Sequence, residues 1–462
     1  MQQVVNKKED IALEKEFAQA ELELQGVNGK RVSMVFDEPE LTSDAGIVAV
    51  SHFEKGMGLI KKLAACVRDW RLNPEHGMEE LIAQRVHQII SGNPDGNDSD
   101  RLRHDAAIQT AAGREEVLAS QPTMSRLDNN IGKKDLVRMA RVLGDAFLDS
   151  FKKAPKMIVI DMDPTAHLVY GQQQLGLFNT HVGDTCLMPF HVYDGLTGRL
   201  ITTTIREGKT PNAGEIISLL KRIVAGIRNR FPHTVLVFRA DSHHAKPEVM
   251  EWLRANSVQW VTGLSPNKRL NEQFSDVIEK ARQTYEENRL EDKDAREARL
   301  FESGYYAAGT WKREERVVCR VIAGPLGVDV RYIVTSFEGC GARFLYDEVY
   351  CDRANAELFI KDHKLGLESD RSPCESALAN QFRLFLHSAA YVVLHHFRER
   401  ALAGTKLARA SFQQIRVKLL KVAGRVQRLK TRIRFHLPLH FGFKEIFIRV
   451  ANLAVAESRP SP

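Results

Sequence analysis

Two short apolar runs, each closed by an aspartate, constrain the fold of this chain more than any other feature. The first runs from Met157 to Asp163 and the second from Thr234 to Asp241. Both have the length and the apolar, β-branched composition of buried strands, and Pro164 ends the first. A helical pattern from Ile216 to Ile227 lies between them. This order predicts a mixed sheet with helices packed on it, in which two strands end in a carboxylate.

The segments around these runs extend the prediction. Helical patterns such as Met78 to Ile90 and Asp135 to Phe151 predict a helical region over residues 1–150. Thr185 to Val192 and Arg199 to Arg206 predict a hairpin around Asp194-Gly195, a helix is predicted to start at Thr210 as its cap, and Gln259 to Leu264 predicts a further strand. Residues 151–264 are therefore expected to form the first part of an α/β core.

Beyond residue 264 the composition changes. A polar helix is predicted from Asn271 to Ala298, followed by β-forming runs at Arg316 to Ala323 and Val328 to Phe337. We therefore expect a β-rich insertion at 265–345 and a second part of the core at 346–400. The remainder, 401–462, is expected to be a basic region that begins with a helix from Ser411 to Arg432.

Four polar residues share a predicted helix in the second part of the core: Tyr350, Arg353, Glu357 and Lys364. Their separations of three, four and seven residues turn a helix by about 300, 400 and 700 degrees, so they project from roughly one face. A carboxylate on such a face can hold a metal ion while Arg and Lys bind phosphates beside it. On geometry alone, an exposed face with i,i+4 ion pairs explains the same pattern.

Carboxylates at the ends of the two predicted strands can join Glu357 in a metal site. Asp241 and Glu357 join an acid from the first strand, and either Asp161 or Asp163 can fill that place because residues two apart on a strand share a face. Clustered carboxylates repel one another, and two Mg²⁺ ions about 3.5–4 Å apart would relieve the repulsion and activate a phosphodiester. His243-His244 could also reach such a site, although a loop role is the simpler reading.

Charge favours an anionic partner. The chain has a net charge of +7 and a pI near 9.0, and from Lys406 to Arg449 it carries twelve Lys and Arg against one acid, Glu445. The residues expected to bind DNA there are Arg416, Lys418, Lys421, Arg425 and Arg428. The six cysteines form no C-x-x-C pair, and neither a signal peptide nor a membrane span is predicted. A cytoplasmic protein is expected.

The motifs resemble a known family. Asp163-Pro164-Thr165, Arg239-Ala240-Asp241-Ser242 and the Y-x2-R-x3-E-x6-K pattern that ends at Lys364 together resemble the DDE transposases of bacterial insertion sequences, in the group with the Tyr-Arg-Glu-Lys signature on an RNase H-like fold. Further stretches resemble one subgroup: Leu118 to Thr123, Gly171 to Leu175, Asp370 to Ser372 and Asn380 to Arg383. Ala354 and Leu358 depart from it, where Gly and Asn are expected.

The resemblance implies roles for single residues. It implies that Asp163, Asp241 and Glu357 bind two Mg²⁺ ions, which Mn²⁺ could replace, and it favours Asp163 over Asp161 because Thr165 completes the family's Asp-x-Thr pattern. It further implies that Tyr350, Arg353 and Lys364 contact phosphates, and that Trp311 in the insertion handles DNA hairpin ends.

The function implied is that of a DNA transposase. It would cut the inverted repeats at the ends of its own element and join the 3′-hydroxyls to target DNA, working as a homodimer because two ends must be held together. Two alternatives remain open: a metal-dependent nuclease that does not join strands, and a DNA-binding derivative without catalysis.

Overall fold

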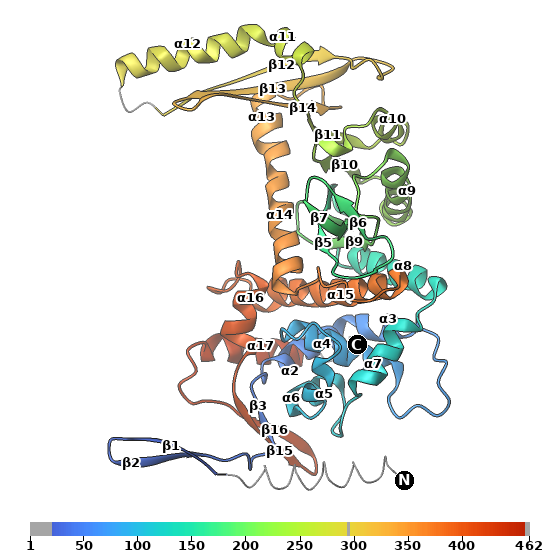
Figure 1. The fold of residues 1–462 in the computed structure, drawn as a ribbon, viewed down its shortest axis with the longest axis vertical. Coiled ribbons are helices and arrows are strands. Elements are labelled where there is room, and N and C mark those ends of the chain that lie inside the picture. Colours follow the sequence, from blue (N-terminus) through green and yellow to red (C-terminus); the bar gives the residue numbers. More distant parts are fainter. Residues whose placement is uncertain (1–20, 293–295, 458–462) are drawn as a thin grey trace.

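A mixed eight-stranded sheet forms the centre of the molecule (Figure 1). The computed structural model describes residues 21–292 and 296–457. The strands of the sheet core are β4 (Met157–Pro164), β8 (Phe190–Asp194), β9 (Leu200–Thr204), β10 (Val235–Ala240) and β11 (Gln259–Leu264). β10 lies parallel to both β4 and β11, whereas β8 runs antiparallel to β4 and to β9. The predicted mixed sheet with helices packed on it is thus confirmed.

The pleat of β4 divides its side chains between the two faces of the sheet. Ile158, Ile160 and Met162 enter a hydrophobic core with helix α9 (Ala213–Arg230) and with α10 (Pro247–Ala255). The alternate residues, which include both aspartates of the strand, face the opposite side. α9 begins two residues later than expected, because Asn212 rather than Thr210 caps it by accepting a hydrogen bond from the Glu215 amide at 2.9 Å.

The insertion prolongs this sheet rather than forming a separate one. Its strands are β12 (Ala298–Tyr306), β13 (Glu315–Gly324) and β14 (Gly327–Thr335), and β14 pairs antiparallel with β11. Helices α11 (Lys268–Gln273) and α12 (Ser275–Glu291) pack across the new strands. The polar helix predicted from Asn271 to Ala298 corresponds to α12 and is shorter than expected. Insertion and core are therefore joined through continuous backbone hydrogen bonds.

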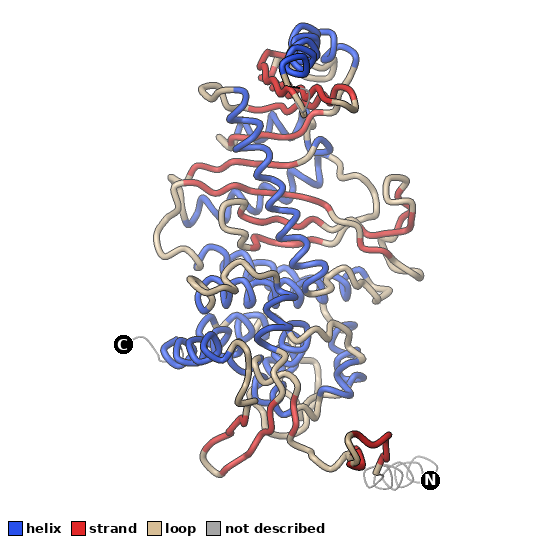
Figure 2. Tube along the Cα trace, turned by 90° about the vertical axis from the view of Figure 1, so that its left-hand side faces the viewer, coloured by secondary structure: helices blue, strands red, loops and turns tan. Residues whose placement is uncertain are grey.

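One long irregular helix, residues 342–366, crosses the face of the sheet opposite α9 (Figures 1 and 2). We call it the signature helix. It consists of α13 (Ala342–Phe344), a π turn (Leu345–Tyr350), a 3₁₀ turn (Cys351–Arg353), α14 (Ala354–Lys361) and a second π turn (Asp362–Gly366). A π turn carries more residues per turn than an α-helix, and such turns are frequent at functional sites.

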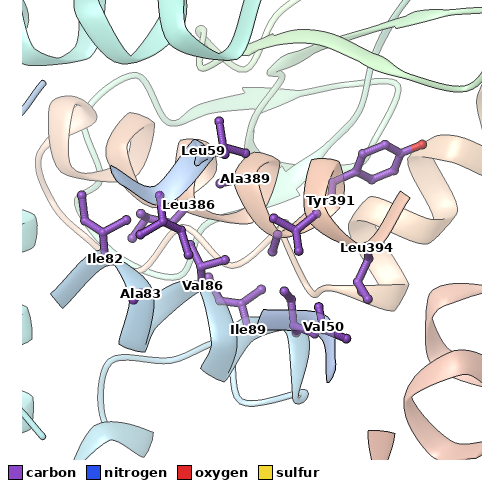
Figure 3. Close-up of a cluster of buried hydrophobic side chains, with 14 of the residues drawn as sticks. Val50, Leu59, Ile82, Ala83, Val86, Ile89, Leu386, Ala389, Tyr391 and Leu394 are labelled. Carbon is purple, nitrogen blue, oxygen red and sulfur yellow. The ribbon is translucent and has the colours of Figure 1, made fainter. Parts of the chain in front are cut away.

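The N-terminal helices pack around a later helix, α15 (Ala377–Ala401). Figure 3 shows side chains of Val50, Ile82 and Val86 against Leu386 and Leu394 of α15, all of them fully buried. The helices that contribute are α2 (Ile47–Met57), α3 (Leu59–Ala64), α4 (Met78–Ile90), α5 (Asp98–Leu102), α6 (Ala106–Ala112), α7 (Gln121–Asn129) and α8 (Lys133–Asp149). Segments far apart in sequence thus share one core below the sheet.

The C-terminal region corrects one prediction. The basic helix expected from Ser411 to Arg432 is wrong: a short α16 (Phe412–Ile415) and a π turn (Arg416–Leu420) give way to a hairpin of β15 (Gly424–Leu429) and β16 (Arg432–His436). Apolar residues alternate with polar ones through β16, which is the pattern of a strand with one buried face. β3 (Leu41–Thr42) pairs with β15, and α17 (Lys444–Glu457) follows.

Smaller strands complete the fold. β1 (Leu22–Val27) and β2 (Lys30–Met34) form an exposed hairpin, and β5 (His167–Leu168), β6 (Leu177–Asn179) and β7 (Asp184–Leu187) form a small sheet. The hairpin predicted from Thr185 is realised by β8 and β9 only, because β7 ends before Pro189. Within the described ranges, no helix combines the length and the apolar character that a membrane crossing requires.

Candidate active site

The carboxyl ends of β4 and β10 bring two acids to one edge of the sheet. These strands are parallel neighbours, and Arg239 of β10 pairs in register with Asp161 of β4. Asp163 and Asp241 both lie two residues beyond this pair, where the strands end. The two carboxylates are close enough that the charge of Asp241 raises the pKa of Asp163.

Asp161 is tied into a buried ion pair. Its two carboxylate oxygens accept hydrogen bonds from Nε and Nη2 of Arg239 at 2.6 and 2.7 Å, and only 1% of Asp161 is exposed. Burial raises the pKa of Asp161 to about 6 while Arg239 acts in the opposite direction. The third nitrogen of Arg239 donates to the Val349 carbonyl at 2.7 Å, so the pair also holds the signature helix against the sheet.

Asp163 has a different environment. Its nearest cation is Arg353, whose Nη1 lies 3.4 Å from Oδ2, and about a fifth of its side chain reaches solvent. Burial and the neighbouring charge of Asp241 raise the pKa of Asp163 to about 7, although Arg353 opposes the shift. Of the two acids that the sequence left open, Asp163 is the one whose oxygens are not already taken by a bidentate partner.

Asp241 caps the short turn that follows β10. Oδ1 accepts a hydrogen bond from the His243 amide at 3.0 Å and lies 2.7 Å from Nδ1 of His244. Burial acts to raise the pKa of Asp241, but the hydrogen bond with His244 and the nearby imidazoles outweigh it and hold the pKa below its usual value. His244 is fully buried and therefore fixes the orientation of this carboxylate.

Glu357 reaches the same site from the signature helix. Its side chain is 61% exposed, and Oε1 lies 3.3 Å from Nη2 of Arg353 one turn earlier. Arg353 therefore bridges Asp163 and Glu357. The i,i+4 ion pair expected for an exposed helix face is present between Arg353 and Glu357, but Arg353 also contacts Asp163 of the sheet.

The other two residues of this helix face, Tyr350 and Lys364, contact the rim of the site. The Tyr350 ring lies 6.0 Å from the Arg353 guanidinium, and a Cβ placed on Gly263 would come within 2.7 Å of the Tyr350 hydroxyl. Lys364 donates to the Ala166 carbonyl at 2.7 Å, just beyond β4. Beside Tyr350 and Arg353 a polar cleft of about 540 Å³ opens toward β13 and β14.

The donors at this edge suit a hard divalent cation, but they do not yet surround one. Carboxylate oxygens are the ligands that Mg²⁺ prefers, and the repulsion felt by Asp163 is what such a cation would relieve. Among the described residues, however, no group of three His, Cys, Asp or Glu is close enough to hold an ion. The guanidinium of Arg353 stands between two of the acids.

Two residues near the site were missed at the sequence level. His191 lies opposite Asp163 on β8, and its Nδ1 is 3.0 Å from Nδ1 of His363, the neighbour of Lys364. Both rings are fully buried, and burial lowers the pKa of His363 to about 3. This neutral pair joins the strand beside Asp163 to the signature helix.

The predicted DNA-contact residues of the C-terminal region divide into three groups: buried, ion-paired and exposed. Arg416 is buried and donates from Nε to the Ile90 carbonyl at 2.8 Å, so we remove it from the set. Lys421 pairs with Asp44 at 2.7 Å, and Arg428 pairs with Glu40 at 3.2 Å. Lys418 and Arg425 are exposed.

Trp311 lies outside the acidic site. It belongs to the loop between β12 and β13, where its ring packs edge-on against Tyr306 at 5.6 Å and against the core of the insertion. Its role in handling DNA ends stays a prediction.

The site and fold together define an α/β protein with acids at the edge of a mixed sheet and a third acid on a crossing helix. Residues 24–458 match the family model described as Transposase DDE domain group 1, and because the match spans most of the chain, the chain belongs to that transposase family.

Among solved structures, the chain is similar to a piggyBac transposase in a cryo-EM synaptic complex with hairpin DNA. The TM-score is 0.42 and the sequence identity is 11%, over 82% of this chain and 80% of that chain. No curated protein sequence matches the chain significantly.

Proposed function

We propose that the chain is an active DNA transposase in which Asp163, Asp241 and Glu357 bind the metal ions for strand cleavage and strand transfer. The observation that carries this proposal is the meeting of Asp163 and Asp241 at the ends of two parallel strands, with Glu357 joined to Asp163 through Arg353. Membership of the DDE transposase family supports it.

The proposed cofactor is a pair of Mg²⁺ ions, for which Mn²⁺ can substitute. When bound, they would lower the pKa of a water or 3′-hydroxyl nucleophile and neutralise the leaving oxygen at a phosphodiester. The chain itself orients the carboxylates: His244 fixes Asp241, and the buried Asp161–Arg239 pair fixes the strand that carries Asp163. Arg353, once displaced from the acids, is free to bind a DNA phosphate together with Tyr350 and Lys364.

The proposed substrates are the terminal inverted repeats of a bacterial insertion sequence and its target DNA. The Tyr-Arg-Glu-Lys pattern and an RNase H-like arrangement of the core are part of this proposal. Two ends must be cut and joined, so we propose a homodimer on DNA, acting in the cytoplasm at the nucleoid.

The first experiment tests the acids. Asp241→Asn and Glu357→Gln each remove one carboxylate charge with little change in size, and we expect both to abolish Mg²⁺-dependent cleavage of an inverted-repeat duplex while DNA binding persists. Asp145→Asn, an exposed acid on α8, is the matched control and should cleave like the parent protein. Full cleavage by either site variant would overturn the assignment.

A second assay separates a transposase from a nuclease that cuts without joining. Duplexes with pre-cut ends and a free 3′-hydroxyl are incubated with a target plasmid and Mg²⁺. Joined products support strand transfer. Cleavage of uncut ends without any joined product would favour the nuclease.

A further inference from the structure

The hairpin of β15 and β16 has one outer face made entirely of polar and basic residues, apart from Leu429. Residues directly opposite each other in an antiparallel ladder share a face. The ladder pairs Arg425 with His436, Gln427 with Arg434, and Leu429 with Arg432. All six of these residues are exposed to solvent.

The inner face fixes the orientation of this hairpin. Val426 is buried, and Phe435 packs against the helical core. Arg428 belongs to the inner face as well, where it pairs with Glu40 and donates to the Gln109 side chain at 2.5 Å. Because these contacts anchor one side, the opposite side presents its cations outward.

These outer cations lack the internal partners that neutralise their neighbours. Lys421 and Arg428 are ion-paired and Arg416 is buried, whereas no ion pair with a carboxylate in the described part of the chain involves Arg425, Arg432 or Arg434. Lys430 at the tip adds a further charge, and the segment 424–444 contains no acid. Like charges packed on one ribbon destabilise it unless an anion is bound.

We propose that this hairpin is a DNA-reading ribbon that enters the major groove of the duplex at the end of the element. Gln427 and Arg434, side by side at the centre of the outer face, read base edges, and Arg425, Lys430 and Arg432 contact phosphates. The proposal rests on the proposed function and adds to it the surface that selects the sequence.

Shape and chemistry support this occupant. A major groove about 12 Å wide admits a two-stranded ribbon, and Arg pairs bidentately with guanine as Gln does with adenine. A second copy of this chain would need a complementary acidic surface or apolar contacts, and the outer face offers only two separate apolar side chains among the described residues, Leu429 and, on the adjoining β3, Leu41.

The position of the ribbon determines which part of the DNA it reads. In Figures 1 and 2 the hairpin lies at the end of the molecule opposite the insertion, with α14 between them. Glu357 belongs to α14. A duplex whose cut end lies at the acids and whose body reaches the ribbon is therefore read inside the element, away from the cleaved bond.

The first test removes the charge. The full-length triple variant Arg425→Ala/Arg432→Ala/Arg434→Ala is compared with the parent by fluorescence anisotropy, using a duplex obtained by binding-site selection from a random pool. We expect the affinity to fall at least about tenfold and the slope of log K against log salt to fall by about 2, as for two lost phosphate contacts.

The matched control removes three exposed cations outside the ribbon, two of them on α9, in Lys153→Ala/Lys221→Ala/Arg222→Ala. It should bind like the parent. Unchanged affinity and salt slope in the ribbon variant would overturn the proposal, as would equally strong competition by a double-stranded RNA of the same sequence.

The second test keeps the charge and changes the reading group. Arg434→Lys retains one positive charge but cannot form the bidentate contact, and Gln427→Ala removes the amide. We expect each to lose about tenfold in discrimination at one position of the selected site, with total affinity for unrelated duplexes unchanged. If both variants select the same DNA sequence as the parent protein, the base-reading role is contradicted.

Cleavage is measured in the same preparations, so the two proposals fail separately. Loss of binding in the ribbon variant supports the ribbon even if the parent protein never cleaves. Cleavage by the parent combined with normal binding and specificity in all ribbon variants overturns the ribbon and leaves the acidic site intact.

Discussion

Two arginine–carboxylate groups lie next to each other on the same face of the sheet, and they differ in almost every physical respect. In the inner group, Asp161 and Arg239 form a bidentate pair at 2.6 and 2.7 Å that is closed to water. In the outer group, Arg353 contacts Asp163 and Glu357 at 3.4 and 3.3 Å, and Glu357 is largely exposed.

The difference indicates a division of work. A buried charge pair with ideal geometry is costly to break, because removal of one partner leaves the other charge uncompensated. Loose contacts at the surface contribute little to stability and are easily exchanged for other ions. The inner pair therefore holds the strand and the signature helix in place, and the outer group keeps its oxygens available.

The largest expected effect falls on the inner pair. Asp161→Ala should lower the free energy of unfolding by about 3–5 kcal/mol, because Arg239 would remain buried without a counter-charge. Urea denaturation followed by circular dichroism measures the loss. The double variant Asp161→Leu/Arg239→Met should recover most of it, and a double variant as unstable as Asp161→Ala would contradict the pairing.

For the outer group the expected effect is on catalysis. Asp163→Asn should reduce Mg²⁺-dependent DNA cleavage by more than about 100-fold, which exceeds the usual effect of losing a residue that only supports a metal ligand. Its stability at pH 8 should not fall, because a carboxylate that repels Asp241 is removed. If Asp163→Asn cleaves normally, the first acid of the triad is misassigned.

Asp163 also predicts a pH dependence of the metal-free protein. Its pKa is raised to about 7, so between roughly pH 4 and pH 7 the folded state binds a proton that the unfolded state has released. Stability should therefore fall as the pH rises through this window, by at most about 1.4 kcal/mol per pH unit from this group. Denaturation in EDTA at several pH values measures the slope, and Asp163→Asn should flatten it. An equal slope in both proteins would contradict the raised pKa.

The smallest effect sharpens the contrast between the two arginines. Arg353→Lys cannot bridge both acids, yet its contacts are long and partly exposed, so the unfolding free energy should change by less than about 1 kcal/mol. Arg239→Lys, the same substitution at the inner pair, should cost clearly more because its bidentate geometry is lost. Equal losses of stability in the two variants would contradict a difference between the two arginines.

Much of the sheet and the order of its acids could be predicted from the sequence. β4, β10, β11 and α4 follow from local apolar patterns, and their bounds in the structure lie close to those expected. The attachment of the insertion could not be predicted in this way, because the pairing of β14 with β11 joins segments about seventy residues apart and depends on packing rather than spacing.

The sequence named the acids of the candidate site, but it did not reveal the residues that hold them in place. Residue spacing could not distinguish Asp161 from Asp163. The structure distinguishes them through Arg239, which pairs with Asp161. A charged residue inside the apolar run Val235–Ala240 was the available sign of a buried acidic partner. The hairpin of β15 and β16 was missed because its many arginines suit a helix surface as well as a strand.

The continuous sheet makes the insertion a lever. Its innermost strand, β14, pairs with β11, and β11 lies beside β10, the strand that ends just before Asp241. A displacement of the outermost strand, β12, would therefore pass through four strand pairings before it reached β10 and the carboxylate that follows it. The position of the insertion and the position of Asp241 are thus coupled through one hydrogen-bonded sheet.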